Sequence, residues 1–138
     1  KGLADGVLEV RDDSLRAIDA QGEPALAPVL FDWFEATGFS VSDEVTRLRC
    51  VTLVAELDAD YATEVLSPKL DTGVRSRMGD FVKGGGMSEW NRLAVEGLAV
   101  AATPEAIATL RACRTKGSDD FRDLVTQRLV SARRKAGA

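Results

Sequence analysis

The sequence contains no histidine. Histidine is the commonest general base, the commonest metal ligand and the usual proton switch near neutral pH. Serine, threonine and cysteine nucleophiles need an activating base, and no motif in this sequence places one beside them. We therefore predict a protein that is not an enzyme, with no catalytic residues, no cofactor and no metal site.

Cysteine, aromatic residues and long apolar runs are also scarce. The two cysteines, Cys50 and Cys113, lie in apolar helical stretches, a setting that predicts buried free thiols in the reducing cytoplasm and no disulfide framework. Aromatic residues are 6% of the chain, so its core must consist mostly of Leu, Val and Ala. No apolar run approaches the roughly 18 residues of a membrane span, and no signal peptide is visible. We expect no membrane partner.

The composition is that of a folded globular protein. The chain has 138 residues, with 45% hydrophobic and 29% charged side chains, which suits one domain. It opens on Lys1-Gly2 without a methionine. We therefore expect residues 1–138 to form a single all-helical domain that is a piece of a longer protein. Acidic residues outnumber basic ones in residues 1–60, and the reverse holds afterwards. Such an asymmetry either steers a partner or solubilises the two ends.

Apolar residues recur with helical spacing between short turn signals, and little in the sequence favours strands. Glycines stop several of these stretches, and Ser, Thr or Asp residues stand where helices begin. The predicted helices cover residues 12–20, with a start near Val7 as the alternative, and 24–36, 42–57, 61–70, 74–82, 89–101, 103–116 and 118–134.

Three helix–turn–helix segments align with one another, namely residues 17–30, 53–66 and 97–110. A hairpin with an apolar face on both helices cannot cover those faces alone, whereas stacked hairpins bury a continuous core. Five columns match without gaps when the two residues before each segment are included: Leu15, Val51 and Val95; Ile18, Val54 and Leu98; Pro24, Asp60 and Pro104; Leu26, Ala62 and Ala106; and Leu30, Leu66 and Leu110.

Residues 22–30, Gly-Glu-Pro-Ala-Leu-Ala-Pro-Val-Leu, and their copies at 58–66 and 103–110 resemble the HEAT family of α-helical repeats. Leu70-Asp71-Thr72-Gly73-Val74-Arg75 is similar to the Asp…Val-Arg junction of that family, and Asp120-Phe121-Arg122 is a looser version of it. The resemblance implies an all-α fold, an α-solenoid of about three antiparallel helical hairpins wound as an α–α superhelix. It also implies a protein–protein interaction scaffold whose inner layer of helices contacts another protein.

The same layering implies a set of binding residues. Polar side chains of helices 42–57 and 88–101 would face the concave surface, and the alternative for each is simple solvation. Trp33 lies off the apolar phase of its helix, so it is either an interface anchor or a core residue. The candidates are Glu44, Arg47, Arg49, Asn91, Arg92, Glu96 and Trp33.

Two other functions remain open from the sequence. A ligand-binding and dimerisation domain of a TetR-like transcriptional regulator has the same length and composition, but it requires an apolar pocket and a two-fold interface. A HEAT-like nucleic-acid-binding module would use the basic residues near the end of the chain, although the pI of about 4.9 opposes this. Those basic residues are Arg111, Arg114, Lys116, Arg128, Arg133, Arg134 and Lys135.

Three further features have ordinary structural explanations. We expect Gly84-Gly85-Gly86 to be a flexible linker and not a phosphate loop, because the Lys-Ser/Thr of such a loop does not follow it. The acidic pairs at helix starts, such as Asp119-Asp120, act as caps. Apolar residues at the two ends predict self-association through exposed end repeats: Leu3, Val7 and Leu8 at one end, and Leu129 and Val130 at the other.

Overall fold

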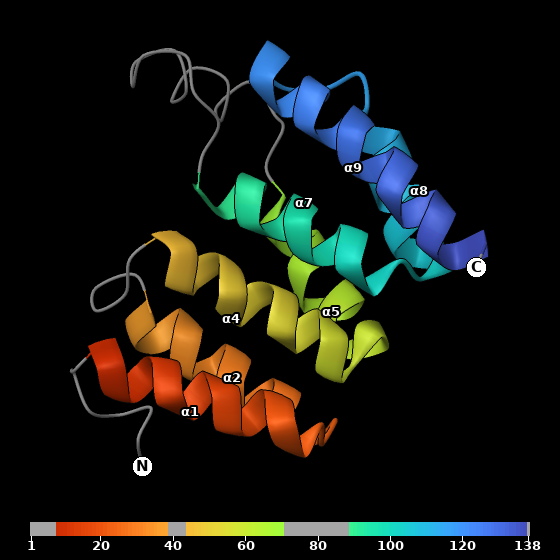
Figure 1. Ribbon diagram of the computed structural model, residues 1–138. Coiled ribbons are helices and arrows are strands. Elements are labelled where there is room, and N and C mark those ends of the chain that lie inside the picture. The colour runs from red at the N-terminus through yellow and green to blue at the C-terminus, as the bar shows by residue number, and fades with distance from the viewer. Residues whose placement is uncertain (1–7, 39–43, 71–88, 138) are drawn as a thin grey trace.

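The computed structural model describes residues 8–38, 44–70 and 89–137, and this part of the chain is all-helical (Figure 1). The helix at 89–101 has the predicted bounds, while the helix predicted at 74–82 and the Gly84–Gly86 linker lie outside the described residues. In chain order the elements are α1 (Leu8–Gln21), α2 (Leu26–Trp33), the π-helical turn η2 (Phe34–Gly38), α4 (Glu44–Leu57), α5 (Ala59–Leu66), the 3-10 turn η3 (Ser67–Lys69), α7 (Glu89–Ala101), α8 (Pro104–Cys113) and α9 (Asp119–Gly137).

Short polar side chains begin three of these helices. The Thr103 hydroxyl accepts a hydrogen bond from the Ala106 N–H at 3.0 Å, and Pro104 occupies the first turn of α8. The Asp58 carboxylate accepts from the Tyr61 N–H at 3.0 Å. The predicted helix at 61–70 follows a turn at Asp58–Asp60, but α5 already begins at Ala59 because Asp58 caps it. The Ser118 hydroxyl caps α9 in the same way.

The helices pack in a regular order. In Figure 1, α1, α4, α7 and α9 follow one another from the bottom of the view to the top, with α5 behind α4 and α7 and with α8 behind α9. Helix α4 packs against α1, α2, α5 and α7, and α7 packs against α4, α5, α8 and α9. The two central helices are therefore covered by neighbours on several sides.

The aligned apolar columns of the sequence form the core. Leu30, Leu66 and Leu110 are each 0% exposed and lie on α2, α5 and α8 respectively. Leu15, Val51 and Val95 are likewise buried, on α1, α4 and α7. In the other two apolar columns the second and third members are buried, while the first members, Ile18 and Leu26, are only partly buried.

Two predictions about apolar surfaces are wrong. The spacing of Val45, Leu48, Val51, Val54 and Leu57 predicts one buried stripe on this helix. Val45 is nevertheless 77% exposed, and residues off the stripe, Cys50 and Leu53, are fully buried. The reason is that α2, α5 and α7 cover α4 from several directions, so a single stripe does not describe its buried surface. Leu129, expected at an open end, is 3% exposed, whereas its neighbour Val130 is exposed. Leu3, Val7 and the side chain of Leu8 lie outside the described part of the chain.

An aromatic cluster joins α2 to α7. The Trp90 ring lies 5.5 Å from the Phe34 ring and 6.1 Å from the Phe31 ring, centroid to centroid, and Phe31 also meets Tyr61 edge-on. Lys69 Nζ lies 4.8 Å above the Trp90 ring, as a cation–π contact. This cluster couples α2 and η2 directly to the start of α7.

Cys50 and Cys113 are buried free thiols, as predicted. Burial raises the pKa of the Cys113 thiol above its ordinary value of 9.0, and Lys116 opposes this only in part. The unfolded chain therefore ionises this thiol at lower pH than the folded protein does. The contribution of Cys113 to the free energy of unfolding is therefore complete below the pKa of this thiol in the unfolded chain. It is lost as the pH rises through the pKa of the thiol in the folded protein.

We expect the free energy of unfolding to fall as the pH rises above about 9, and to fall less steeply in Cys113→Ala. Urea denaturation followed by circular dichroism at several pH values measures both slopes. Equal slopes in the two proteins would show that Cys113 does not contribute.

Candidate interaction groove

A groove of about 710 Å³ opens at the N-terminal ends of α4, α7 and α9. The first turns of these three helices, which are distant in sequence, come together here because α7 packs between α4 and α9. Its walls are largely charged and part of its floor is apolar. The lining residues are Glu44, Arg47, Leu48, Glu89, Arg92, Leu93, Asp120, Asp123, Leu124 and Gln127.

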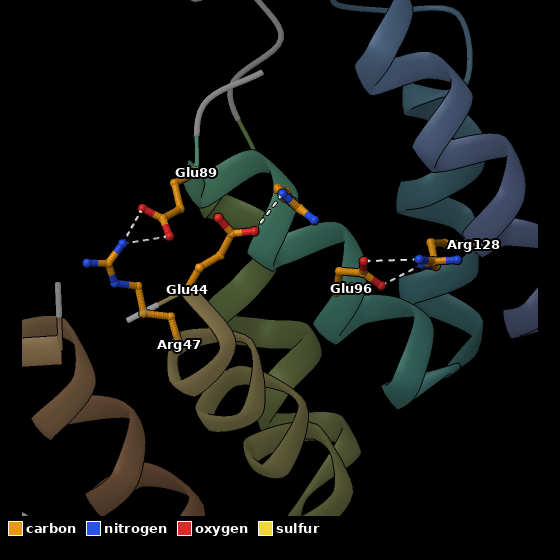
Figure 2. Close-up of polar contacts among 6 residues, drawn as sticks. Glu44, Arg47, Glu89, Glu96 and Arg128 are labelled. Atoms are coloured by element: carbon orange, nitrogen blue, oxygen red, sulfur yellow. Dashed lines mark hydrogen bonds and ion pairs between the residues drawn. The ribbon is translucent and has the colours of Figure 1, made fainter. Parts of the chain in front are cut away.

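Two reciprocal ion pairs connect the α4 and α7 sides of the groove. Arg47 Nη1 donates to both carboxylate oxygens of Glu89, at 2.8 and 2.9 Å (Figure 2). Arg92 Nη1 donates to Glu44 Oε1 at 3.0 Å. Glu44 and Glu89 stand in the first turns of their helices, where the helix dipole favours a carboxylate. Each arginine follows three residues later on the same side of its own helix, so each faces the glutamate of the other helix.

Two further ion pairs link the same row of helices outside the groove. Arg128 of α9 binds Glu96 of α7 through Nε at 2.5 Å and Nη2 at 3.2 Å, a bidentate arrangement visible in Figure 2. The hydrogen bond with Glu96 raises the pKa of Arg128 above its ordinary value. Arg49 of α4 binds Asp19 of α1 at 2.7 Å. Ion pairs thus join α1 to α4, α4 to α7, and α7 to α9.

The structure divides the seven candidate binding residues into two groups. Glu44, Arg47 and Arg92 line the groove. The remaining four lie elsewhere: Glu96 and Arg49 in the ion pairs between helices, Asn91 in the interior and Trp33 packed against the core.

Asn91 was expected on the surface, but it is 2% exposed. Helices α4, α5, α8 and α9 surround α7, so several faces of that helix are buried and one of them includes position 91. Trp33 is partly buried against the core and does not line the groove.

The groove has an acidic excess. Its two arginines are bound to its two glutamates, and among the described residues no cation pairs with the exposed carboxylates of Asp120 and Asp123. Asp119, which precedes them, is bound to Arg122 and does not line the groove. The groove therefore contains two aspartates whose charge no ion pair with another described residue neutralises.

The sequence did not single out the α9 side of the groove. Asp120 was interpreted as a cap, and Asp123, Leu124 and Gln127 were not considered. A usable signal was present, because Asp120, Asp123, Leu124 and Gln127 follow the spacing of three and four residues that marks one helix face. Glu89 was also missed, although it holds the same first-turn position in α7 as Glu44 does in α4.

The apolar floor has three leucines, one from each helix. Leu93 of α7 is 2% exposed, while Leu48 of α4 and Leu124 of α9 are partly buried against the core. They give the groove an apolar surface between charged walls, an arrangement common in sites that bind a side chain by its stem and its head group together.

The basic residues near the end of the chain do not form one patch. Arg114 and Lys116 lie in the turn before α9, whereas Arg133 and Arg134 lie in its last turns, roughly 25 Å further along the helix. Arg128 is bound to Glu96, and Lys135 donates to the Val100 carbonyl. Cations at the C-terminal end of α9 interact favourably with the helix dipole.

The described residues contain no group of three or more carboxylate or thiol side chains placed to hold a metal ion. Within residues 8–38, 44–70 and 89–137, no helix combines the length and apolar character needed to cross a bilayer.

No protein-family model, curated protein or solved structure matches this chain. The resemblance to HEAT repeats therefore rests on residues 22–30, 58–66 and 103–110 and on the two junctions at 70–75 and 120–122.

The ion pair between Glu96 and Arg128 gives a test of how α7 and α9 are held together. We expect Glu96→Gln to lower the free energy of unfolding by about 1 kcal/mol, because the Glu96 side chain is 13% exposed but Arg128 keeps access to water. Chemical denaturation measures the change. The matched control is Glu105→Gln on exposed α8 surface, which should change stability by less than about 0.5 kcal/mol. Equal losses in both variants would contradict a specific role for the pair.

Proposed function

We propose that this chain is a HEAT-like α-solenoid module that holds another protein in the groove formed by α4, α7 and α9, and that it has no catalytic activity of its own. The observation that carries the proposal is the groove itself. Three helices present their first turns side by side, with charged walls and a leucine floor. Mixed surfaces of this kind suit protein recognition, where apolar contact supplies affinity and charged groups supply specificity.

The solenoid part of the proposal is supported by two properties of the helices. The aligned sequence columns fall on equivalent helices, α1, α4 and α7 for the first halves and α2, α5 and α8 for the second halves. The second helix of each unit also packs against the first helix of the next, as α2 does on α4 and α5 does on α7. The contact of Trp90 with Phe31 and Phe34 departs from strict nearest-neighbour stacking and ties the units more closely.

We propose the cytoplasm as its location, supported by the two buried free thiols. The two alternatives receive less support. The groove is lined mainly by charged and polar side chains, whereas a TetR-like ligand domain requires an apolar pocket. The cations that a nucleic-acid-binding module would use are divided between the two ends of α9.

Site-specific photo-crosslinking tests the proposal. A photoreactive amino acid replaces Gln127, which is exposed and lines the groove, and in a matched control it replaces Glu64, exposed on α5. In extracts of the source cells we expect one protein to crosslink through position 127 and not through position 64. That protein, once purified, should bind the wild-type chain and compete with the crosslink. Identical products from both positions, or a purified product that does not bind, would refute the proposal.

A further inference from the structure

We infer that the groove binds a positively charged segment of the partner protein, one in which apolar side chains lie between two cationic ones. The inference rests on the proposed function and adds to it the chemistry of the partner.

The charges of the groove favour a cationic occupant. Arg47 and Arg92 are already bound to Glu89 and Glu44, so they offer little to an anionic partner. Among the described residues, no cation forms an ion pair with Asp120 or Asp123, and the neighbouring Arg122 is bound to Asp119. Asp120 and Asp123 stand three residues apart on α9, on the same side of the helix, and both line the groove.

Helix capping does not account for both aspartates. The helix dipole explains an acidic residue in the first turn, and Asp120 is in that turn. Asp123 lies in the next turn, where the effect of the dipole has fallen off. A partner arginine would bind such carboxylates well, because its guanidinium offers paired donors to a carboxylate and its stem covers apolar surface.

The volume of the groove and its three leucines indicate what kind of partner segment can bind there. Its volume of about 710 Å³ is typical of pockets that enclose a small molecule or a few side chains, so it accommodates a short peptide segment. Leu48, Leu93 and Leu124 line the groove together with its charged residues. Apolar side chains located between the cations of the partner would cover these leucines.

The C-terminal end of a second copy matches only part of this pattern. Arg133, Arg134 and Lys135 supply cations, but they are consecutive, and the flanking residues Ala132 and Ala136 are too small to cover the leucine floor. Lys135 also donates to the Val100 carbonyl within its own chain. We therefore assign the groove to a different protein, and self-association becomes an outcome that the experiment can reveal.

The experiment measures binding of a fluorescein-labelled peptide, Gly-Arg-Leu-Leu-Arg-Gly, by fluorescence anisotropy. The groove variant is Asp120→Asn with Asp123→Asn, which removes both charges and keeps the shape. The matched control is Asp60→Asn with Glu105→Gln, which makes the same change in net charge at exposed first-turn positions outside the groove. Two further peptides replace both arginines with glutamate or both leucines with serine.

We expect the groove variant to bind the Arg-Leu peptide about tenfold more weakly than the wild type, with the control variant unchanged and with added salt weakening the wild-type complex. Both altered peptides should bind more weakly to the wild type. Equal binding by the groove variant and the wild type, or equal binding of the glutamate peptide, would overturn the inference.

The experiments distinguish a failure of the basic-segment inference from a failure of the proposed scaffold function. A protein that crosslinks at position 127 and binds the Asp120→Asn/Asp123→Asn variant as tightly as the wild type would overturn the basic-segment inference and leave the scaffold function standing. Concentration-dependent self-association that the same variant abolishes, without peptide binding, would assign the groove to a second copy and overturn the inference as well.

Discussion

Replacing Gly97 with valine is expected to lower the free energy of unfolding by about 3 kcal/mol, at the upper end of the usual cost of overpacking. Gly97 lies inside α7 where this helix contacts both α4 and α5. A Cβ atom at this position would overlap Leu66 Cδ1 and lie only 2.7 Å from Val51 Cγ1. Leu66 is 0% exposed and Val51 is 1% exposed, so neither has room to move aside. Guanidinium denaturation followed by circular dichroism measures the loss.

Two glycine-to-alanine changes separate overpacking from helix propensity. Gly97→Ala adds only the Cβ, so the overpacking is offset by roughly 1 kcal/mol of better helix propensity, and a net loss of about 1 kcal/mol is expected. Gly137→Ala, where nothing lies within 4 Å of the added atom, should change stability by less than about 0.5 kcal/mol. A Gly97→Ala protein as stable as the wild type would contradict the close approach of α7 to α4 and α5.

Local signals in the sequence were sufficient to predict most helix boundaries. Gly22 ends α1 with a φ of 64°, and Thr103 with Pro104 begins α8, so both signals acted through backbone chemistry within a few residues. Ala102, just after the predicted end of α7, adopts a φ of 52°, a conformation that alanine disfavours and that its residue type does not indicate.

The apolar columns predicted much of the core for a similar reason. A periodic apolar face must be buried somewhere, whichever neighbour covers it. The sequence could not say how many neighbours each helix has. Because α4 and α7 are covered on several sides, the predictions for Val45 and Asn91, which assumed a single buried face, were wrong.

The groove was predicted only in part because its geometry depends on contacts between distant segments. Arg47 and Glu89 are 42 positions apart in the chain, and neither residue alone indicates the other. Each polar residue could be placed on a helix from the sequence, but the direction of its side chain depends on the packing of α4, α7 and α9. Three of the seven candidates consequently line the groove, and the α9 wall was not foreseen.

Replacing Thr103 with valine is expected to lower the free energy of unfolding by about 2–3 kcal/mol. The Thr63 hydroxyl donates to the Ala59 carbonyl at 2.9 Å, so it has no proton left for Thr103. The Thr103 hydroxyl must therefore donate in the 2.7 Å bond to Thr63, while it accepts from the Ala106 N–H. Valine keeps the shape but removes both bonds, and it leaves the buried N–H of Ala106 without its acceptor. Urea denaturation measures the change.

Two matched variants show whether the hydroxyl of Thr103 is responsible. Thr103→Ser keeps the hydroxyl and loses one methyl group, so it should cost about 1 kcal/mol or less. Thr63→Val leaves the bond between Thr103 and Ala106 in place and should cost about 1 kcal/mol. Because the double Thr63→Val/Thr103→Val variant removes the shared bond only once, its loss should be smaller than the sum of the two single losses. Additive losses, or equal losses for Thr103→Val and Thr103→Ser, would show that the buried bond between Thr63 of α5 and Thr103 at the start of α8 does not contribute to stability.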